Sequence, residues 1–285
     1  MKKIHMIILL SAVLWLPVPV SAQDTGDMQW SRTVMDGSRT GVTVPAATDV
    51  EKALGAVKGN TYYAPSGKVF KGGTVARVAE AVIEAQPAMA PVKKVIGYSP
   101  EAMASEYPES PLSNWFADNL MRATEDACGR HVDMSIANFG GIRVDMPQGD
   151  VTVDDIRSMF PFKNDLVYLS MTGKEIRHVL EWMAEEGFQV LGGVRVVAED
   201  GELLSAEIGC RPLDDNAVYG VATISFLLHG GDGLYLADGA EEVVDIPVDI
   251  YTAMVRIVGE DAAAGKPITG AVDGRVTIID DKGGE

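Results

Sequence analysis

The stretch Leu166-Val167-Tyr168-Leu169-Ser170-Met171-Thr172-Gly173 shows most directly how this chain folds. Its first six residues are mostly apolar, β-branched or aromatic, which predicts a buried strand. From Thr172-Gly173 to about Glu186 the apolar residues follow the spacing of an amphipathic helix. A strand that leads directly into such a helix predicts a sheet with helices packed on it.

The same alternation continues through the rest of the chain. Strand patterns occur at residues 131–137, 190–198, 203–208, 218–225 and 275–279, and helical patterns at 75–88, 111–128 and 246–258. Thr152 and Asp155 resemble a capping box that opens a short helix ending before Pro161. Adjacent strands such as 190–198 and 203–208 suggest hairpin pairing. We therefore expect an α/β or α+β fold with mixed sheets covered by helices.

The first 22 residues have the pattern of a signal peptide. Lys2 and Lys3 precede an apolar run over residues 4–20, and Val20-Ser21-Ala22 offers small residues for cleavage. A membrane anchor is the alternative, but the run is short and is interrupted by polar residues and prolines. We expect an exported, periplasmic or extracellular protein, with an N-terminal arm or lead-in at 23–73, a main domain at 74–285, and no membrane span after cleavage.

Charge and cysteine content limit the classes of partner. The formal net charge of the 285-residue chain is −17, which disfavours attraction to DNA, RNA or an anionic membrane. A small anionic ligand is still compatible, because one local Arg or Lys can dominate inside a cleft. Cys128 and Cys210 could form a disulfide in an oxidising compartment or could be two small buried residues, and their number and spacing do not decide between these.

Two glycine-rich turns carry candidate binding residues. Asn138-Phe139-Gly140-Gly141-Ile142-Arg143 follows a predicted buried strand, and its glycines allow close approach of the backbone to a ligand. Phe226, at the end of another strand, is followed by Gly230-Gly231-Asp232-Gly233. Asp232 could accept hydrogen bonds from two ribose hydroxyls, although an Asx turn is the simpler explanation for an Asp in such a turn.

A third segment, Phe160-Pro161-Phe162-Lys163-Asn164, breaks the chain between a helix and a strand. Phe160 closes the helix, so we expect it in the core. Phe162 lies beyond the proline, where the helix cannot easily bury it. Phe162 and Phe226 lie on separate loops and could stack on both faces of a planar base. We expect the two rings to face each other across an open cleft, roughly 7 Å apart.

Taken together and in this order, the three segments resemble the carboxy-terminal domain of the 5′-nucleotidases. The resemblance runs from about Val95 to Ile279 and includes the segment 109–114, Thr172-Gly173 and Gly192-Gly193. It implies a substrate-binding fold that holds the base and ribose of a nucleoside or nucleoside monophosphate. The implied substrate-binding residues are Asn138, Arg143, Phe162, Asn164, Gly192, Phe226 and Asp232.

The sequence departs from that family in two respects. Glu106 and Pro108 occupy the stretch where the family has an arginine, so one ribose or phosphate contact is in doubt. The two-metal phosphatase domain is not found: none of the histidines at 131, 178 and 229 has the sequence context of a dinuclear site. We therefore expect no catalytic residues and no cofactor in this chain, with divalent metals only in a partner phosphatase.

Three functions remain open at this point. The first is the binding half of a split, exported 5′-nucleotidase whose separate metallophosphatase chain supplies the metals for nucleotide catabolism. The second is a stand-alone nucleoside-binding protein. The third is a structural protein whose pocket is a relic, which the altered stretch at Glu106 and Pro108 would fit.

Overall fold

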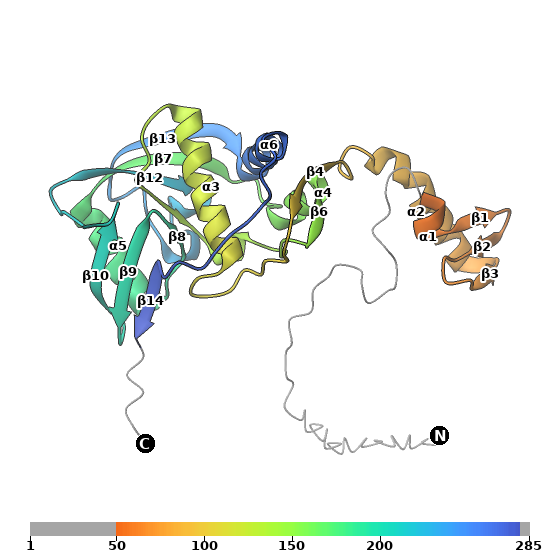
Figure 1. Ribbon diagram of the computed structural model, residues 1–285, viewed down its shortest axis with the longest axis horizontal. Helices are drawn as coiled ribbons and strands as arrows, with labels where there is room; N and C mark the ends of the chain where they lie inside the picture. Colours follow the sequence, from red (N-terminus) through yellow and green to blue (C-terminus); the bar gives the residue numbers. More distant parts are fainter. Residues whose placement is uncertain (1–49, 280–285) are drawn as a thin grey trace, which may run out of the picture. The chain divides into compact units, whose positions relative to one another are not determined.

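The computed structural model describes residues 50–279, and the segment interpreted as a signal peptide lies outside this range. Four sheets are present in this part of the chain (Figure 1). They have two, three, four and five strands, and parallel and antiparallel pairs occur together. The predicted α/β class with mixed sheets is confirmed. No helix within residues 50–279 is long and apolar enough to cross a membrane.

Residues 50–89 form a small helix-and-sheet module. Helix α1 (Val50–Leu54) precedes the antiparallel strands β1 (Ala56–Lys58), β2 (Thr61–Tyr63) and β3 (Val69–Lys71), and helix α2 (Gly73–Met89) packs on them. Strands β1 to β3 lie within the arm or lead-in predicted at 23–73, of which residues 23–49 are outside the described range, and the helix predicted at 75–88 is α2. An apolar groove of about 390 Å³ runs along α2 beside Leu54 and Tyr62. The boundary between residues 73 and 74 stays a prediction.

The five-stranded sheet holds most of the predicted motifs. Its strand order is β13-β7-β12-β5-β8. The strands are β5 (Met134–Ala137), β7 (Asp165–Thr172), β8 (Val190–Gly192), β12 (Val218–Ile224) and β13 (Ala240–Asp249). Within this sheet β5 and β12 pair in parallel, and the other neighbours are antiparallel. All four residues of β5 are buried, as expected for a strand in the middle of a covered sheet.

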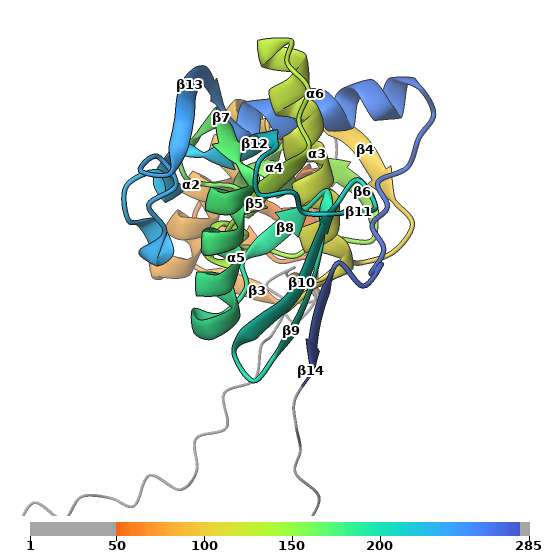
Figure 2. The ribbon, with the colours of Figure 1, turned by 90° about the vertical axis from the view of Figure 1, so that its left-hand side faces the viewer.

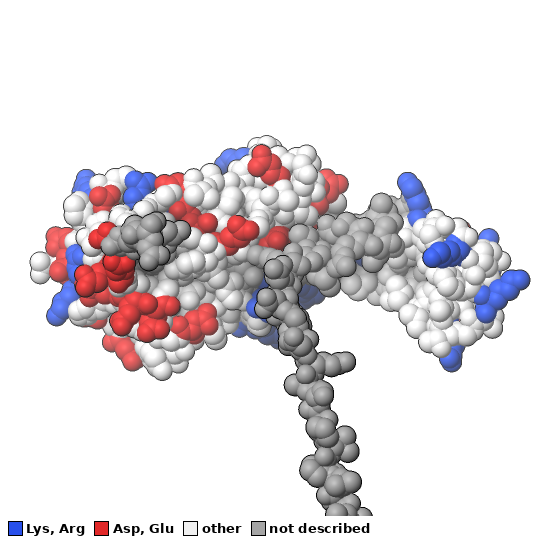
Figure 3. Space-filling model, turned by 90° about the horizontal axis from the view of Figure 1, so that it is seen from below, with Lys and Arg blue, Asp and Glu red and all other residues white. Residues whose placement is uncertain are grey.

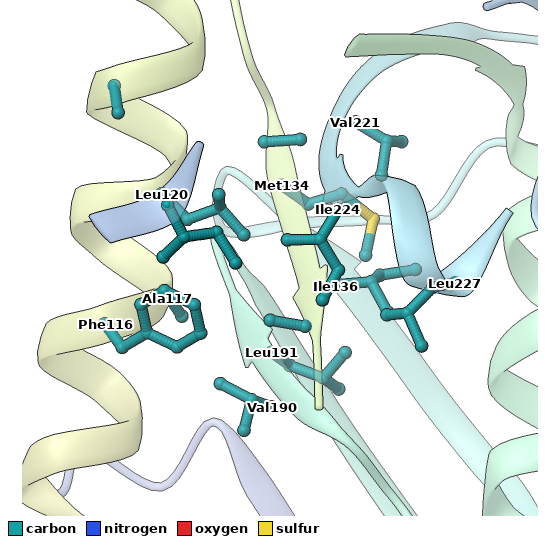
Figure 4. Close-up of a cluster of buried hydrophobic side chains, with 14 of the residues drawn as sticks. Phe116, Ala117, Leu120, Met134, Ile136, Val190, Leu191, Val221, Ile224 and Leu227 are labelled. Carbon is teal, nitrogen blue, oxygen red and sulfur yellow. The ribbon is translucent and has the colours of Figure 1, made fainter. Parts of the chain in front are cut away.

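Helix α3 (Pro111–Cys128) covers this sheet and has the predicted bounds. Ser110 caps its first turn through a reciprocal capping box with Ser113, and Gly129 ends it in a left-handed conformation. Figure 4 shows side chains of α3 packed toward β5 and β8. The contacting residues include Phe116, Ala117, Leu120, Met134, Ile136, Val190 and Leu191.

A four-stranded sheet, β11-β10-β9-β14, lies beside this core. It contains β9 (Val194–Glu199), β10 (Glu202–Ile208), β11 (Arg211–Pro212) and β14 (Val276–Ile279), and Figure 2 shows β10, β9 and β14 side by side. The β9–β10 hairpin confirms the predicted pairing. Helix α5 (Gly173–Glu186) packs on β7 and β10. The remaining pair is β4 (Val95–Ser99) with β6 (Gly149–Thr152).

Two predicted elements need correction. The strand expected at 190–198 is two strands in different sheets, because Gly193 has a φ of 69° and a Cβ there would lie 2.3 Å from the carbonyl oxygen of Asp133. The helix expected at 246–258 begins only at Ile250, as α6 (Ile250–Ala263), and residues 246–249 end strand β13. Pro247 is tolerated there because β13 is an edge strand.

Other local expectations agree with the structure. Helix α4 (Val153–Met159) opens with the predicted Thr152–Asp155 capping box and ends before Pro161. Phe160 is buried, and its ring centroid lies 4.6 Å from that of Phe116, which confirms its place in the core. Cys128 and Cys210 are both free thiols. Cys128 is half-buried and Cys210 is exposed, so the pair is neither a disulfide nor two buried residues.

A buried arginine fastens the C-terminal strand to the core. Arg275, only 8% exposed, donates hydrogen bonds to the carboxylates of Asp118 and Asp273 and to the carbonyl of Leu191. Burial opposes its charge, but these hydrogen bonds outweigh burial and hold the pKa of Arg275 above its ordinary value. Hydrogen bonding from Arg275 in turn lowers the pKa of Asp273.

The carboxylate of Glu109 completes this attachment. It accepts hydrogen bonds from the side chain of Asn114 and from the backbone N–H groups of Asp273, Gly274 and Val276. A carboxylate that satisfies several backbone donors is a strong anchor. Glu109 and Asn114, both within the resembling segment 109–114, therefore have a structural role here.

The fold predicts that Arg275→Met lowers the free energy of unfolding by about 2 kcal/mol at neutral pH, because hydrogen bonds to charged groups contribute roughly 1.5–3 kcal/mol. Asp273 has a lowered folded-state pKa. Its stabilisation is therefore present above its unfolded-state pKa and lost as the pH falls through the folded value. Urea unfolding should show a smaller difference between wild type and variant at acid pH.

The exposed Arg211 on β11 provides the control, and Arg211→Met should leave stability unchanged within about 0.5 kcal/mol. An unfolding free energy that Arg275→Met does not alter would contradict the assignment. An effect equally large in acid and at neutral pH would contradict the role of Asp273.

Candidate functional site

The site lies where three strands of the five-stranded sheet meet one edge. In register, β12 places Val221 beside Met134 of β5 and Ile224 beside Leu166 of β7. Because β5 and β12 are parallel and β7 is antiparallel, the residues after β5, after β12 and before β7 share that edge. The three glycine- and phenylalanine-containing motifs occupy these three positions, so tertiary structure brings them together.

Two side-chain hydrogen bonds hold the strand ends in this arrangement. The buried hydroxyl of Thr223 donates to the carbonyl of Ile136 at 2.8 Å, which ties β12 to β5. The hydroxyl of Ser225 accepts from the N–H of Asp165 at 3.1 Å, which ties the chain after β12 to the start of β7. The motif loops therefore leave the sheet from fixed points.

Asn138 is the polar centre of the site. Its side chain is buried, with the residue 5% exposed, and its Nδ2 donates a hydrogen bond to Oδ2 of Asp232 at 2.6 Å. The other side-chain atom, Oδ1, is buried without a hydrogen-bond partner. A buried polar atom left unpaired is costly, and Oδ1 is an acceptor that no described residue satisfies.

Glycine is required beside this amide. A Cβ at Gly141 would lie 2.7 Å from Oδ1 of Asn138, closer than side chains pack. Asn138 has an extended backbone and is followed by the short 3-10 helix η2 (Phe139–Gly141). The Gly140-Gly141 pair thus leaves room for the carboxamide, which agrees with the close approach expected from the sequence.

Asp232 sits at the tip of the second turn. It is exposed and has a left-handed backbone, with φ 48° and ψ 30°, inside the short helix η4 (Gly231–Gly233). A non-glycine residue in this conformation carries some strain, a feature enriched at functional sites. Its carboxylate bonds to Asn138, 94 residues away in sequence. Asp232 is therefore more than a residue that stabilises its own turn, because its carboxylate is also hydrogen-bonded to a distant segment.

The two predicted aromatic residues are both exposed. Phe162 has 48% and Phe226 44% of its surface accessible, unlike the buried Phe160. Phe226 lies in the short helix η3 (Ser225–Leu227), and its backbone approaches Gly231 so closely that a Cβ there would lie 2.1 Å from its carbonyl oxygen. Both rings are thus available for contact. Their mutual orientation stays a prediction.

Arg143 contributes a cation at the same place. It is exposed, and its guanidinium carbon lies 5.8 Å from the centroid of the Phe162 ring, within the range of a cation–π contact. Nη1 also donates to the carbonyl of Gly140 at 3.1 Å. The arrangement presents a positive charge next to a flat apolar surface.

Asn164 and Gly192 occupy different surroundings. A small hollow brings Asn164 together with Asn138, Gly141 and Phe162 over an apolar floor, which consists of Phe116, Phe160, Ile224 and Ile250. Gly192 is buried, and a Cβ there would meet Ser135 at 2.5 Å and Ala117 at 3.0 Å. Packing between β5 and α3 accounts for this glycine, and its contact with a base stays a prediction.

The three histidines within residues 50–279 lie apart from this arrangement or on its rim. The His131 ring lies 3.4 Å from the carboxylate of Glu125 and 3.5 Å from that of Asp133, and the His178 ring lies 3.5 Å from that of Glu175. His229 is exposed beside Gly230. Among residues 50–279, no group of three or more His, Cys, Asp or Glu side chains could hold a metal ion. The described residues therefore offer binding groups but no metal centre.

Three supporting residues escaped the sequence analysis. The Tyr107 ring meets Phe139 edge-on, with centroids 6.0 Å apart. The stretch around Glu106 and Pro108, which departs from the family, therefore lies beside the turn at residues 138–143. Gln189 accepts a hydrogen bond from the N–H of Phe139, and Trp182 lies against Gly233. Local sequence gives little sign of these contacts, because each joins segments that are distant in the chain.

Comparison with known proteins agrees with this geometry. Protein UshA of Yersinia enterocolitica is 33% identical over 119 residues, covering 40% of this chain and 21% of UshA. The 5′-nucleotidase of Vibrio cholerae is 30% identical over 143 residues, covering 48% of this chain and 25% of that protein. The chain thus spans about a quarter or less of the length of these curated relatives.

Solved structures share the fold. A 5′-nucleotidase precursor from Thermus thermophilus superposes with a TM-score of 0.63 at 24% identity, covering 77% of this chain and 48% of that one. NAD nucleotidase from Haemophilus influenzae gives a TM-score of 0.57 at 18% identity, covering 78% of this chain and 48% of that one. Residues 91–238, just over half of the chain, match the family model described as 5′-nucleotidase, C-terminal domain. The chain therefore belongs to the 5′-nucleotidase C-terminal domain family.

Proposed function

We propose that this chain is the nucleoside- and nucleotide-binding part of a divided 5′-nucleotidase, and that a separate metallophosphatase chain supplies the metal ions and the hydrolysis. The observation that carries the proposal is the hydrogen-bonded pair of the buried Asn138 and the exposed Asp232. It leaves one acceptor, Oδ1 of Asn138, without a partner, at a sheet edge flanked by exposed aromatic rings.

Each group has a physical role in this proposal. The base stacks between Phe162 and Phe226, an interaction worth about 1–3 kcal/mol per base in nucleic-acid binders. Asp232 accepts hydrogen bonds from the ribose hydroxyls, and Arg143 contributes donors from its exposed guanidinium. Oδ1 of Asn138 accepts from a polar hydrogen of the ligand, while Asn164 contacts the base; Gly192, which is buried under α3, has no such role in this proposal.

In this proposal the chain acts by holding the nucleotide in position for hydrolysis by the partner. Phosphate hydrolysis at a two-metal site depends on holding the phosphorus in line with the attacking oxygen, and fixing the nucleoside removes much of the entropic cost of that alignment. The metals belong to the partner in this scheme, since the described residues offer no ligand set for them. Substrate binding and hydrolysis would then reside on two chains.

We also propose that the protein is exported, on the basis of Lys2, Lys3 and the apolar run over residues 4–20. These residues lie outside the described range. N-terminal sequencing of protein recovered from the periplasm or medium should begin at Gln23 if cleavage follows Ala22. A cytoplasmic product that starts at Met1 would contradict export.

Binding of adenosine should weaken about ten- to a hundredfold in Asp232→Asn, since the ribose loses a charged acceptor worth about 1.5–3 kcal/mol. Phe226→Ala should weaken it by a similar factor through loss of one stacking face. Titration calorimetry measures both. Asp238→Asn and Tyr98→Ala, which change an acid and an aromatic ring outside the site, should bind like the wild type.

Two outcomes would contradict the proposed binding site. One is wild-type protein that takes up no nucleoside or nucleotide at millimolar concentration, which favours a relic pocket. The other is equal loss of affinity in the control variants and in the site variants. If the protein binds nucleosides but the same organism has no partner phosphatase, a stand-alone nucleoside-binding protein would be favoured.

The purified chain should release no phosphate from nucleoside monophosphates with added manganese, zinc, cobalt or calcium, because residues 50–279 hold no metal-ligand cluster. Phosphate release is the measurement. Activity should appear when the partner metallophosphatase is added, and should fall when Asp232→Asn replaces the wild-type chain. Sustained turnover by the chain alone, retained after repeated purification, would rule out the division of labour proposed here.

A further inference from the structure

One short segment touches both halves of the binding site without belonging to either. This segment, residues 182–189, comprises the end of α5 and the chain that leads into β8. Helix α5 is anchored in the core by Ile176, Leu180 and Met183, all fully buried. Trp182 therefore projects from a rigid helix, and Gln189 lies between the buried Phe188 and Val190.

Trp182 supports the turn that carries Asp232. A Cβ at Gly233 would lie 2.8 Å from Cζ2 and 2.9 Å from Cη2 of the Trp182 indole. The outer ring of the indole thus rests directly on the backbone of Gly233, the residue after Asp232. Gly233 also has a φ of 81°, so its lack of a side chain serves both the turn and the contact with Trp182.

Gln189 supports the other turn. Its Oε1 accepts a hydrogen bond of 3.3 Å from the N–H of Phe139, the first residue after Asn138. This N–H lies at the start of the 3-10 helix η2, where backbone donors have no partner within the helix. The bond therefore fixes the turn that orients the Asn138 amide.

We infer that Trp182 and Gln189 are positioning residues that hold Asp232 and Asn138 in register with each other. The carboxylate and the amide meet through a single 2.6 Å hydrogen bond between turns 94 residues apart. An exposed turn held by few contacts must be ordered when a ligand binds, which reduces affinity. Support from one rigid segment makes both turns ready for the ligand beforehand.

Amide hydrogen exchange of the free protein tests this without any ligand. Trp182→Phe keeps an apolar ring but lacks the atoms that contact Gly233. It should speed exchange at Gly230, Gly233 and Leu234, whose N–H groups are bonded within the turn, by about tenfold or more. The N–H groups of Gly141 and Ile142 should exchange as in the wild type.

Substitution of Gln189 should have the opposite pattern of amide exchange. Gln189→Leu should speed exchange at Phe139, Gly141 and Ile142 and spare the turn at 230–234. Gln189→Glu retains an acceptor oxygen and should restore protection. The exposed Glu181 of α5 supplies the control, and Glu181→Gln should change neither turn.

The second test, which measures ligand affinity, rests on the proposed function. Trp182→Phe and Gln189→Leu should each raise the dissociation constant of adenosine about tenfold, with an unchanged melting temperature and with recovery in Gln189→Glu. Absence of adenosine binding by the wild type would overturn the proposed function, while exchange still decides the positioning role. Unchanged exchange at both turns, or faster exchange across the whole domain, would overturn the inference.

Discussion

The pairing of β5, β12 and β7 is the constraint on which the rest of the site depends. One parallel and one antiparallel ladder bring the ends of β5 and β12 and the start of β7 to the same edge of the sheet. A shift of register by one residue would turn each side chain to the opposite face. It would also separate Thr223 from the Ile136 carbonyl, and Asp165 from the Ser225 hydroxyl. The sheet therefore fixes the departure points of all three motif loops.

Helix α3 and the C-terminal strand keep this sheet in place. The carbonyl of Ala117 on α3 accepts from the buried Ser135 hydroxyl of β5, and Gly192 allows β8 to approach the same turn of the helix. Arg275 and Glu109 then join the chain before β14 to the region around α3. The family match ends at residue 238, yet β13 and β14 complete the two large sheets. The folded unit thus extends beyond the segment that the family model recognises.

Electrostatics separate the small module from the rest of the described chain. Residues 90–279 contain 14 Lys or Arg and 31 Asp or Glu, a net charge of −17, whereas residues 50–89 contain five and three, a net charge of +2. Figure 3 shows acidic side chains gathered over one face of the larger part and basic side chains on the module. A polyanion would be repelled by the acidic part. Under the proposed function, a nucleotide is small enough to respond to the exposed Arg143 instead.

Local sequence was sufficient to specify most of the helices and strands and the residue types of the site. The apolar pattern predicted the bounds of α3, the Thr152–Asp155 capping box predicted the start of α4, and the proline break separated the buried Phe160 from the exposed Phe162. The end of strand β13 could not be predicted in this way, since residues 246–258 repeat at helical spacing and only pairing with β7 makes residues 246–249 a strand. The turn at Gly193, which moves the chain between sheets, was missed for the same reason.

How the candidate residues work together depended on the tertiary structure alone. The Asn138–Asp232 bond, the unpaired Oδ1 and the supporting contacts of Trp182 and Gln189 each join segments that are far apart in the chain. Local propensity reflects interactions within a few residues, whereas these contacts arise from strand order and register. The sequence could therefore name the residues, and only the sheet could bring them within hydrogen-bonding distance.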